Sequence, residues 1–315
     1  MSVRDSHFAP IALFAYRRPI HLQRTLGALV RNQGAAESVL HIFVDGPKNR
    51  RDERNVDRTR QVAGEASGFR SVIVHEAPTN QGLSQAVISG VSQVLEAYSE
   101  VIVLEDDIET SPYFLTYMND ALSMYRDDDR VASVHAYTYP VTAPLPSTFF
   151  LLGADCWGWA TWRRAWETFN PNGEALMKAL IQSGDLDLFD FGCPGVFSDM
   201  LRDQIEGRND SWAIRWYASA FLAGMHTLYP GESLVHNFGF DGSGTHGGST
   251  GQYHQIVRES PLDLRPVAVL DSEVARAAFL DFLCEGRADR HPPIASLVPR
   301  IKRKLRRLAV TLRER

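Results

Sequence analysis

The sequence has few cysteines and no motif that pairs them. Its 315 residues contain three cysteines, Cys156, Cys193 and Cys284, and no Cys-x-x-Cys occurs. Zinc sites and disulfide frameworks usually need an even or closely spaced set. We therefore expect neither zinc nor a disulfide framework, and a reducing cytoplasm suits the chain best.

Long apolar runs and a signal peptide are also absent. No hydrophobic stretch approaches the roughly 20 residues that cross a bilayer, and Met1–Asp5 opens no signal peptide. Gly-x-Gly-x-x-Gly does not follow the first predicted strand, which argues against a dinucleotide-binding domain. These absences predict a cytoplasmic protein without a membrane span.

Charge is unevenly distributed along the chain. Arg300–Arg315 holds eight basic residues and one acid, a local charge of +7, so the net charge of −5 leaves −12 for the remainder. An acidic body lacks the basic face that nucleic-acid binding requires, so no nucleic-acid partner is expected.

The basic tail, residues 291–315, has a helical pattern of apolar residues. These residues fall on one stripe of a helix: Ile301, Leu305, Leu308 and Leu312. Basic amphipathic helices are typical of segments that lie on anionic lipid. We expect Arg300–Arg315 to contact an anionic membrane at the inner face of the plasma membrane, with a solvated, frayed tail as the alternative.

The first half of the chain alternates strand and helix patterns. The predicted strands are Ile11–Tyr16, Leu40–Val44, Ser71–His75 and Val101–Leu104, with Val131–His135 returning to the sheet. The predicted helices are Pro19–Arg31, Asp52–Ala66, Leu83–Tyr98 and Pro112–Tyr125. This alternation predicts an α/β fold with a mostly parallel sheet flanked by helices and connected by right-handed crossovers.

Three consecutive carboxylates follow the fourth predicted strand. Glu105, Asp106 and Asp107 lie at the strand end where open α/β sheets bind ligands. These carboxylates repel one another unless a cation offsets their charge. A hard divalent ion, Mg²⁺ or Mn²⁺, shared with a phosphate is the usual solution. The alternative is a solvated loop whose acids interact favourably with the dipole at the N-terminus of the helix that starts at Pro112. Asp107 lies four residues before Ser111, however, and so falls outside the first turn of that helix.

Two further polar residues end predicted strands. Asp45 begins an Asp-Gly-Pro turn, and Arg17 follows the first strand. Neighbouring parallel strands end at one crevice, so Asp45 could accept a hydrogen bond from a base or ribose. Arginine at that edge suits a phosphate or a nucleobase carbonyl. A structural turn for Asp45 and a solvated helix-entry charge for Arg17 remain open.

Asp210 lies in the run Asn-Asp-Ser-Trp, before the apolar helical segment Ala213–Leu222. Asp210 or Ser211 would serve as an ordinary N-cap. In the functional interpretation, Asp210 is a general base at a helix entry, and flanking aromatic residues tune its pKa.

The second unusual run, residues 236–248, is dense in glycine and carries two phenylalanines and two histidines. Glycine leaves backbone N–H groups free to cradle an anion. A disordered linker is the alternative, but a linker would not need those aromatic side chains. We predict a lid that closes over substrate, with His246 as a candidate metal or phosphate partner.

In their order, these segments resemble GT-A glycosyltransferases, specifically the N-acetylglucosaminyltransferase I family and its bacterial relatives. The similarity covers about residues 9–250. The matching positions are Arg17, Asp45, Glu105–Asp107, Gly158-Trp159, Asn209–Trp212 and Phe238–Gly247.

The resemblance implies a UDP-sugar donor and inversion at the anomeric carbon. Asp107 would ligate Mn²⁺ (or Mg²⁺), which bridges the donor diphosphate. Asp106 and Glu105 would face the ribose and donor sugar, and Arg17 and Asp45 would hold the uracil end. The expected activity is transfer of a hexosyl or N-acetylhexosaminyl group, such as N-acetylglucosamine.

The resemblance also implies the acceptor side. Asp210 would deprotonate a hydroxyl of a glycan or lipid-linked acceptor, in bacterial cell-surface polysaccharide synthesis. The family has paired acids where this chain has Asp210-Ser211, so Asp210 is the one carboxylate left to serve as the general base. The donor would be covered by the glycine loop: Gly244, Thr245 and His246. Residues 1–140 would form the nucleotide-sugar half and residues 141–290 the acceptor-binding, catalytic half of one domain.

Three other functions share part of this pattern. A haloacid-dehalogenase-type phosphohydrolase needs a second Asp two residues after Asp45, where this chain has Pro47. A nucleotidyltransferase would share the sheet and metal but expects a glycine-rich basic loop after the first strand. A non-catalytic sugar-binding module would not need the three carboxylates.

Overall fold

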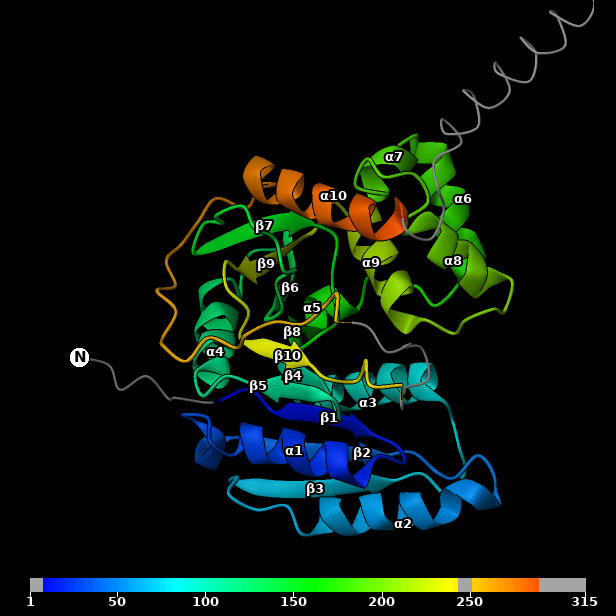
Figure 1. Cartoon of the computed structure of the whole chain (residues 1–315), viewed down its shortest axis with the longest axis vertical. Coiled ribbons are helices and arrows are strands. Elements are labelled where there is room, and N and C mark those ends of the chain that lie inside the picture. The colour runs from blue at the N-terminus through cyan, green and yellow to red at the C-terminus, as the bar shows by residue number, and fades with distance from the viewer. Residues whose placement is uncertain (1–7, 243–250, 289–315) are drawn as a thin grey trace, which may run out of the picture.

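A computed structural model describes residues 8–242 and 251–288 (Figure 1). Its centre is an eight-stranded sheet in the order β3-β2-β1-β4-β8-β6-β9-β7. In that order the strands are Ser71–Glu76, Val39–Val44, Ile11–Ala15, Glu100–Glu105, Trp159–Trp162, Val131–His135, His226–Pro230 and Thr148–Leu152. One continuous sheet therefore joins the two halves of the chain.

The sheet is parallel where the sequence predicts it. β1 pairs in parallel with β2 and β4, and β2 with β3. β8 then runs antiparallel to both β4 and β6, so β4 and β6 point the same way. β9 is parallel to β6, and β7 closes the sheet antiparallel to β9. The carboxyl ends of β1, β2, β4, β6 and β9 therefore share one edge.

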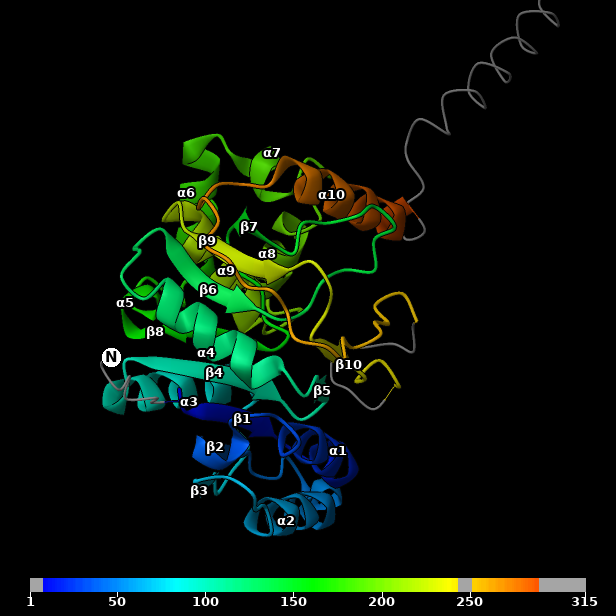
Figure 2. The same cartoon turned by 90° about the vertical axis from the view of Figure 1, so that its left-hand side faces the viewer.

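Ten helices occur in the described part of the chain. They are α1 (Pro19–Leu29), α2 (Arg50–Gly64), α3 (Leu83–Ala97), α4 (Phe114–Met124), α5 (Arg163–Trp166), α6 (Gly173–Ser183), α7 (Leu186–Phe189), α8 (Ser198–Ile205), α9 (Trp212–Leu222) and α10 (Glu273–Ala288). Helices α6 to α8 and α10 lie at the β7 end of the sheet, opposite α2 and β3 (Figures 1 and 2).

Both faces of the central strands are covered. On β1, Ile11 and Leu13 pack in one hydrophobic cluster with residues of α1 and α4. Ala12 and Phe14 point to the other cluster, which α3, α5 and α9 complete. Successive strand residues alternate between faces, so a strand buried on both sides must be apolar throughout, as the predicted strands are.

The sequence-based elements agree well with the structure. The predicted strands and helices of the first half are confirmed to within about two residues, apart from one helix start. That helix begins at Phe114, because the Ser111 N–H donates to Leu234 O, 2.8 Å away, and Ser111 Oγ accepts from the Tyr113 N–H. Pro112 is therefore part of a turn, not the first helical residue.

A small second sheet lies above the main one. β5 (Ile108–Thr110) pairs antiparallel with β10 (Val235–Asn237), with Ile108 opposite Asn237. β5 starts directly after the three carboxylates, so this pairing brings the start of the glycine-rich run next to them. Figure 2 shows the two strands side by side.

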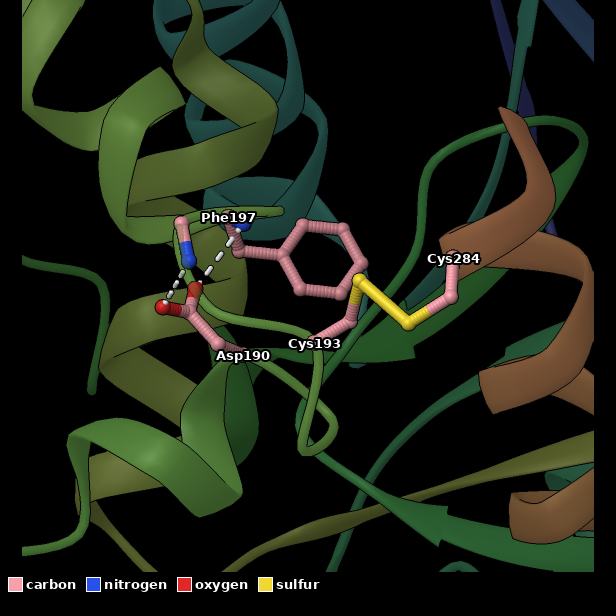
Figure 3. The surroundings of a disulfide bond; sticks show 5 residues. Asp190, Cys193, Phe197 and Cys284 are labelled. Carbon is pink, nitrogen blue, oxygen red and sulfur yellow. Dashed lines mark hydrogen bonds between the residues drawn. A yellow bond between two sulfur atoms is a disulfide. The ribbon is translucent and has the colours of Figure 1, made fainter. Parts of the chain in front are cut away.

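A disulfide joins Cys193 to Cys284 on α10, with the two Cα atoms 5.8 Å apart (Figure 3). Asp190 holds the Cys193 loop, accepting hydrogen bonds from the Phe197 and Ser198 N–H groups. The expectation that the cysteines do not pair is wrong. The partners are separated by 91 residues, and only tertiary packing of α10 brings them together.

Some predictions concern residues outside the described ranges. The basic tail 291–315 and the glycine-loop residues Gly244, Thr245 and His246 belong to this group. Within the described residues, no helix is both long enough and apolar enough to cross a bilayer.

We predict that Cys284→Ser destabilises the fold. The disulfide closes a long loop, and removing such a crosslink usually lowers the free energy of unfolding by about 2–4 kcal/mol. Urea denaturation with and without reductant measures this. Reductant should lower the wild-type midpoint and leave the variant unchanged; a wild-type midpoint insensitive to reductant would contradict the prediction.

Candidate functional site

The candidate site lies at the carboxyl ends of β1, β2 and β4. Arg17 and Arg18 follow β1, Asp45 follows β2, and Glu105–Asp107 end β4 and turn into β5. β1 separates β2 from β4 in the sheet, so these three strand ends are neighbours. Open α/β sheets bind ligands in this position.

Arg18 binds two of the three acidic residues, Asp106 and Asp107. Its Nη2 donates to Asp106 Oδ1 and to Asp107 Oδ2, the latter at 2.8 Å, and its Nε lies 3.4 Å from Asp106 Oδ2. The Arg18 side chain is 17% exposed, and those of the two aspartates are 3% and 12% exposed. Two shielded carboxylates therefore converge on one cationic group.

The backbone of the triplet is anchored from two sides. Thr25 Oγ1, on α1, donates to the Asp106 carbonyl at 2.7 Å. The Phe238 N–H donates to the Asp107 carbonyl at 3.0 Å. A Cβ at position 239 would overlap the Asp107 carboxylate, so only glycine allows the chain to pass this close.

Helix α1 also holds the start of the glycine-rich run. The His21 ring stacks on Phe238 with centroids 5.3 Å apart, and the Arg24 guanidinium lies 4.0 Å from the centroid of the same ring. His21 Nε2 lies 3.1 Å from Asp241 Oδ2. The segment from Phe238 to Asp241 is therefore clamped between α1 and Asp107.

Burial and neighbouring charges make Glu105 and Asp106 harder to ionise. Burial, reinforced by the charges of Asp107 and Asp106, raises the pKa of Glu105 to about 8. Burial raises the pKa of Asp106 to about 6, against the opposing effect of the Arg18 guanidinium. Cations that approach this edge therefore meet a site that favours positive charge and releases protons on binding.

Arg17 and Asp45 are committed to structural contacts. Arg17 Nη1 pairs with Asp52 Oδ1 on α2 at 2.6 Å, not with the triplet. Asp45 accepts hydrogen bonds from the N–H groups of Gly46, Gln81 and Gly82 and from Asn80 Nδ2, at 2.7–3.0 Å. The turn interpretation of Asp45 thus has direct geometric support, and its contact with a base or ribose stays a prediction.

Asp210 lies before α9, where Ser211 is the N-cap and accepts from the Ile214 N–H at 3.2 Å. Asp210 Oδ1 pairs with Arg215 Nη2 at 3.2 Å, and its side chain is 68% exposed. The same Nη2 donates to Ser84 Oγ in the first turn of α3. Because α3 starts at the carboxyl edge of the sheet, this contact holds Asp210 at the same edge as the triplet.

The loop before β8 contributes residues that sequence reasoning did not assign. Antiparallel pairing of Val103 with Trp159 leads this loop past the end of β4. The Cys156 thiol lies in it, and burial together with the charges of Asp155, Glu105 and Asp107 raises its pKa. The Cys156 thiol therefore lies near Glu105 and Asp107, and Asp155 is its neighbour in the chain.

A buried histidine supports this loop. His135 Nε2 accepts from the Trp157 N–H at 3.0 Å, so Nδ1 carries the proton of the neutral ring and lies 3.8 Å from Asp155 Oδ2. Burial lowers the pKa of His135, which keeps the ring neutral. Next to it, the Trp157 ring contacts the aromatic rings of Tyr137, Phe240 and Tyr253.

A divalent ion fits this site only in part. No group of three or more His, Cys, Asp or Glu side chains with metal-binding geometry occurs within residues 8–242 and 251–288. The carboxylate oxygens of Asp106 and Asp107 are nevertheless hard donors that already share one cationic group. Such a pair suits an ion whose remaining ligands are phosphate oxygens and water.

Two site residues escaped the sequence assignment. Arg18 stands beside Arg17 in the sequence, and strand periodicity alone could not say which of the two turns toward β4. Asp155 lies 48 residues after Asp107 in the sequence, and only the antiparallel β4–β8 pairing brings its loop to the end of β4. The one signal available for Asp155 was its position at the start of a glycine- and tryptophan-containing loop.

No family model matches the chain, and three solved structures that resemble it are distant in sequence. A cytidylyltransferase from Leptospira borgpetersenii is 13% identical with a TM-score of 0.33, over 51% of this chain and 63% of that one. A Pyrobaculum calidifontis mannosyltransferase in complex with GDP-Man and Mn²⁺ is 10% identical with a TM-score of 0.30, and the match covers 43% of this chain and 37% of that one. S. aureus TarS is 14% identical with a TM-score of 0.28, and the match covers 47% of this chain and 25% of that one. This chain spans less than two thirds of each, and similarity at this level indicates no function by itself.

We predict that Gly239→Ala destabilises the protein. The added Cβ overlaps the Asp107 carboxylate, and overpacking of this kind costs about 1–3 kcal/mol. Gly64→Ala, on α2, is the matched control, because no atom of the described residues lies within 4 Å of a Cβ there, apart from the helix's own backbone. Urea midpoints of the two variants provide the comparison, and equal midpoints would contradict the close approach of residue 239 to Asp107.

Proposed function

We propose that the protein is a metal-dependent inverting glycosyltransferase that moves a sugar from a UDP-sugar to a hydroxyl of a glycan or lipid-linked acceptor. One observation carries the proposal: two shielded carboxylates, Asp106 and Asp107, converge on a single cationic group at the carboxyl ends of parallel strands. Sugar transfer from a diphosphate needs positive charge at the leaving group, and this site is built to hold it.

Asp107 would hold a Mn²⁺ or Mg²⁺ ion, with Asp106 beside it. When bound, the ion supplies Lewis-acid stabilisation to the departing diphosphate, worth several kcal/mol. Glu105 precedes these ligands in the chain, and Asp155 belongs to the loop that passes the end of β4, so both carboxylates could accept hydrogen bonds from donor hydroxyls. UDP as the nucleotide and inversion as the outcome follow from the family resemblance.

Asp210 is the proposed general base. Its exposed side chain can meet an acceptor hydroxyl, while the ion pair with Arg215 fixes its place next to α3. The aromatic rings in contact with Trp157 would offer a face on which a sugar stacks, and a sugar bound there would displace water. Excluding water limits hydrolysis of the donor.

The acceptor side is proposed to include a cavity of about 750 Å³ beyond the carboxyl ends of β6 and β9. Tyr139, Ser233 and Gln255 are among its lining residues, an aromatic ring and polar groups of the kind that bind saccharides. β6 lies two strands from β4, about 10 Å at the usual strand spacing. A glycan in this cavity would lie at the same edge as the triplet.

The phosphohydrolase alternative has little support in the site. Its nucleophile would be Asp45, but four donors engage that carboxylate and hold it in a loop. The Cys193–Cys284 disulfide does not support the cytoplasmic location expected from the sequence, because disulfides are rare in the reducing cytosol.

We predict that Asp107→Asn abolishes metal-dependent donor binding. The variant loses a charged ligand to the ion, so the UDP dissociation constant in the presence of Mn²⁺ should rise about 100-fold or more. Titration calorimetry with UDP, with and without Mn²⁺, measures this. Asp57→Asn, an exposed α2 residue, is the control. Unchanged UDP–Mn²⁺ affinity in the Asp107 variant would refute the metal assignment.

We predict that Asp210→Asn separates binding from catalysis. Loss of a general base should slow sugar transfer by a factor on the order of 10²–10⁴ without altering UDP–Mn²⁺ affinity. UDP release is followed with a panel of UDP-sugars and saccharide acceptors. Asp203→Asn, an exposed carboxylate paired with Arg208, is the control. Equal transfer rates in wild type and the Asp210 variant would exclude Asp210 as the base.

A further inference from the structure

We propose that Arg18 is an exchangeable counter-ion: it neutralises Asp106 and Asp107 when no donor is bound, and it passes to the donor diphosphate when a divalent cation takes its place. This inference rests on the proposed function and adds a diphosphate-binding residue to it.

The first support is the shared position of one nitrogen. Arg18 Nη2 contacts both carboxylates, so it occupies the point on which the acids converge. A divalent ion bound by Asp107 would stand next to this guanidinium. Two cations this close repel each other in a shielded site, so the guanidinium must leave when the ion arrives.

The second support is a hydrogen-bonding group without a partner. Arg18 Nη1 is buried and makes no hydrogen bond to the described residues. A buried donor without a hydrogen bond is unfavourable, and more so when it is charged. The two aspartates therefore bind Nε and Nη2 of the guanidinium and leave Nη1 without a partner among the described residues. An incoming group with several anionic oxygens would satisfy it, and guanidinium forms bidentate bonds to phosphate readily.

The third support is the contrast with the preceding residue. Arg17 is 46% exposed and pairs with Asp52, which also accepts from the Tyr16 hydroxyl at 3.0 Å. Arg17 therefore has a fixed partner on α2, away from the triplet. Arg18 immediately precedes Pro19, the first residue of α1, so its backbone is restrained while its long side chain can reorient.

The exchange has a thermodynamic consequence. Expelling Arg18 from two buried acids costs several kcal/mol unless another anion receives it. A diphosphate provides that anion, but a metal ion alone does not. Divalent ions should thus bind weakly by themselves and tightly when UDP is present. Arg18 should account for part of this coupling between metal binding and UDP binding.

The test measures Mn²⁺ binding directly, by the electron paramagnetic resonance signal of free Mn²⁺, at a pH of about 8, where protons compete less with the metal ion. Wild type, Arg18→Gln, Arg18→Lys and the control Arg17→Gln are titrated with Mn²⁺ alone and with UDP added. Circular dichroism establishes that each variant is folded.

Arg18→Gln should bind Mn²⁺ alone about 10-fold more tightly than wild type, because no guanidinium competes. Arg18→Lys should show a smaller gain, since an ammonium group cannot bridge both acids as a fork. Arg17→Gln should match wild type. In the Arg18 variants, UDP should enhance Mn²⁺ affinity less than it does in wild type.

The possible failures are distinguishable. Mn²⁺ affinity in the Arg18 variants equal to or below that of wild type overturns the counter-ion role and leaves the proposed function standing. If Arg18→Gln does not fold, the Lys variant decides on the same criterion. An absence of any UDP effect on Mn²⁺ binding in wild type contradicts the proposed function, and this inference with it.

Discussion

The ion pair between Arg18 and the two aspartates is the interaction on which the site depends. It allows three adjacent carboxylates to stand at the end of a buried strand, where their mutual repulsion and desolvation would otherwise be costly. The same pair joins the start of α1 to the end of β4. Through Thr25 and His21, α1 then holds both the Asp106 backbone and the segment that begins at Phe238.

The sheet explains why chemically different groups meet at one edge. Crossover helices cover both faces of the parallel strands, so the strand ends are the open part of this layer. β6 runs in the same direction as β4 because β8, which lies between them, is antiparallel to both. The triplet, the Trp157 loop and the cavity beyond β6 therefore share an edge, a geometry suited to bringing a donor and an acceptor together.

The far end of the molecule is held together in another way. There, β7, α6 to α9 and α10 share a third hydrophobic cluster, and the Cys193–Cys284 disulfide secures α10 against the loop after α7. Phe279 and Phe282 of α10 contact Tyr139, which lines the cavity. The stability of α10 is therefore linked to the shape of the proposed acceptor side.

The sequence by itself determined the fold class, the strand ends and the position of the triplet. Apolar periodicity and turn residues are local properties, which is why β1 to β4 and their helices were predictable. Only the tertiary structure decided that Arg18, not Arg17, faces Asp107, that the loop holding Asp155 passes the end of β4, and that Cys193 meets Cys284. Those outcomes depend on side-chain direction and on contacts between segments far apart in the chain, and a linear pattern encodes neither.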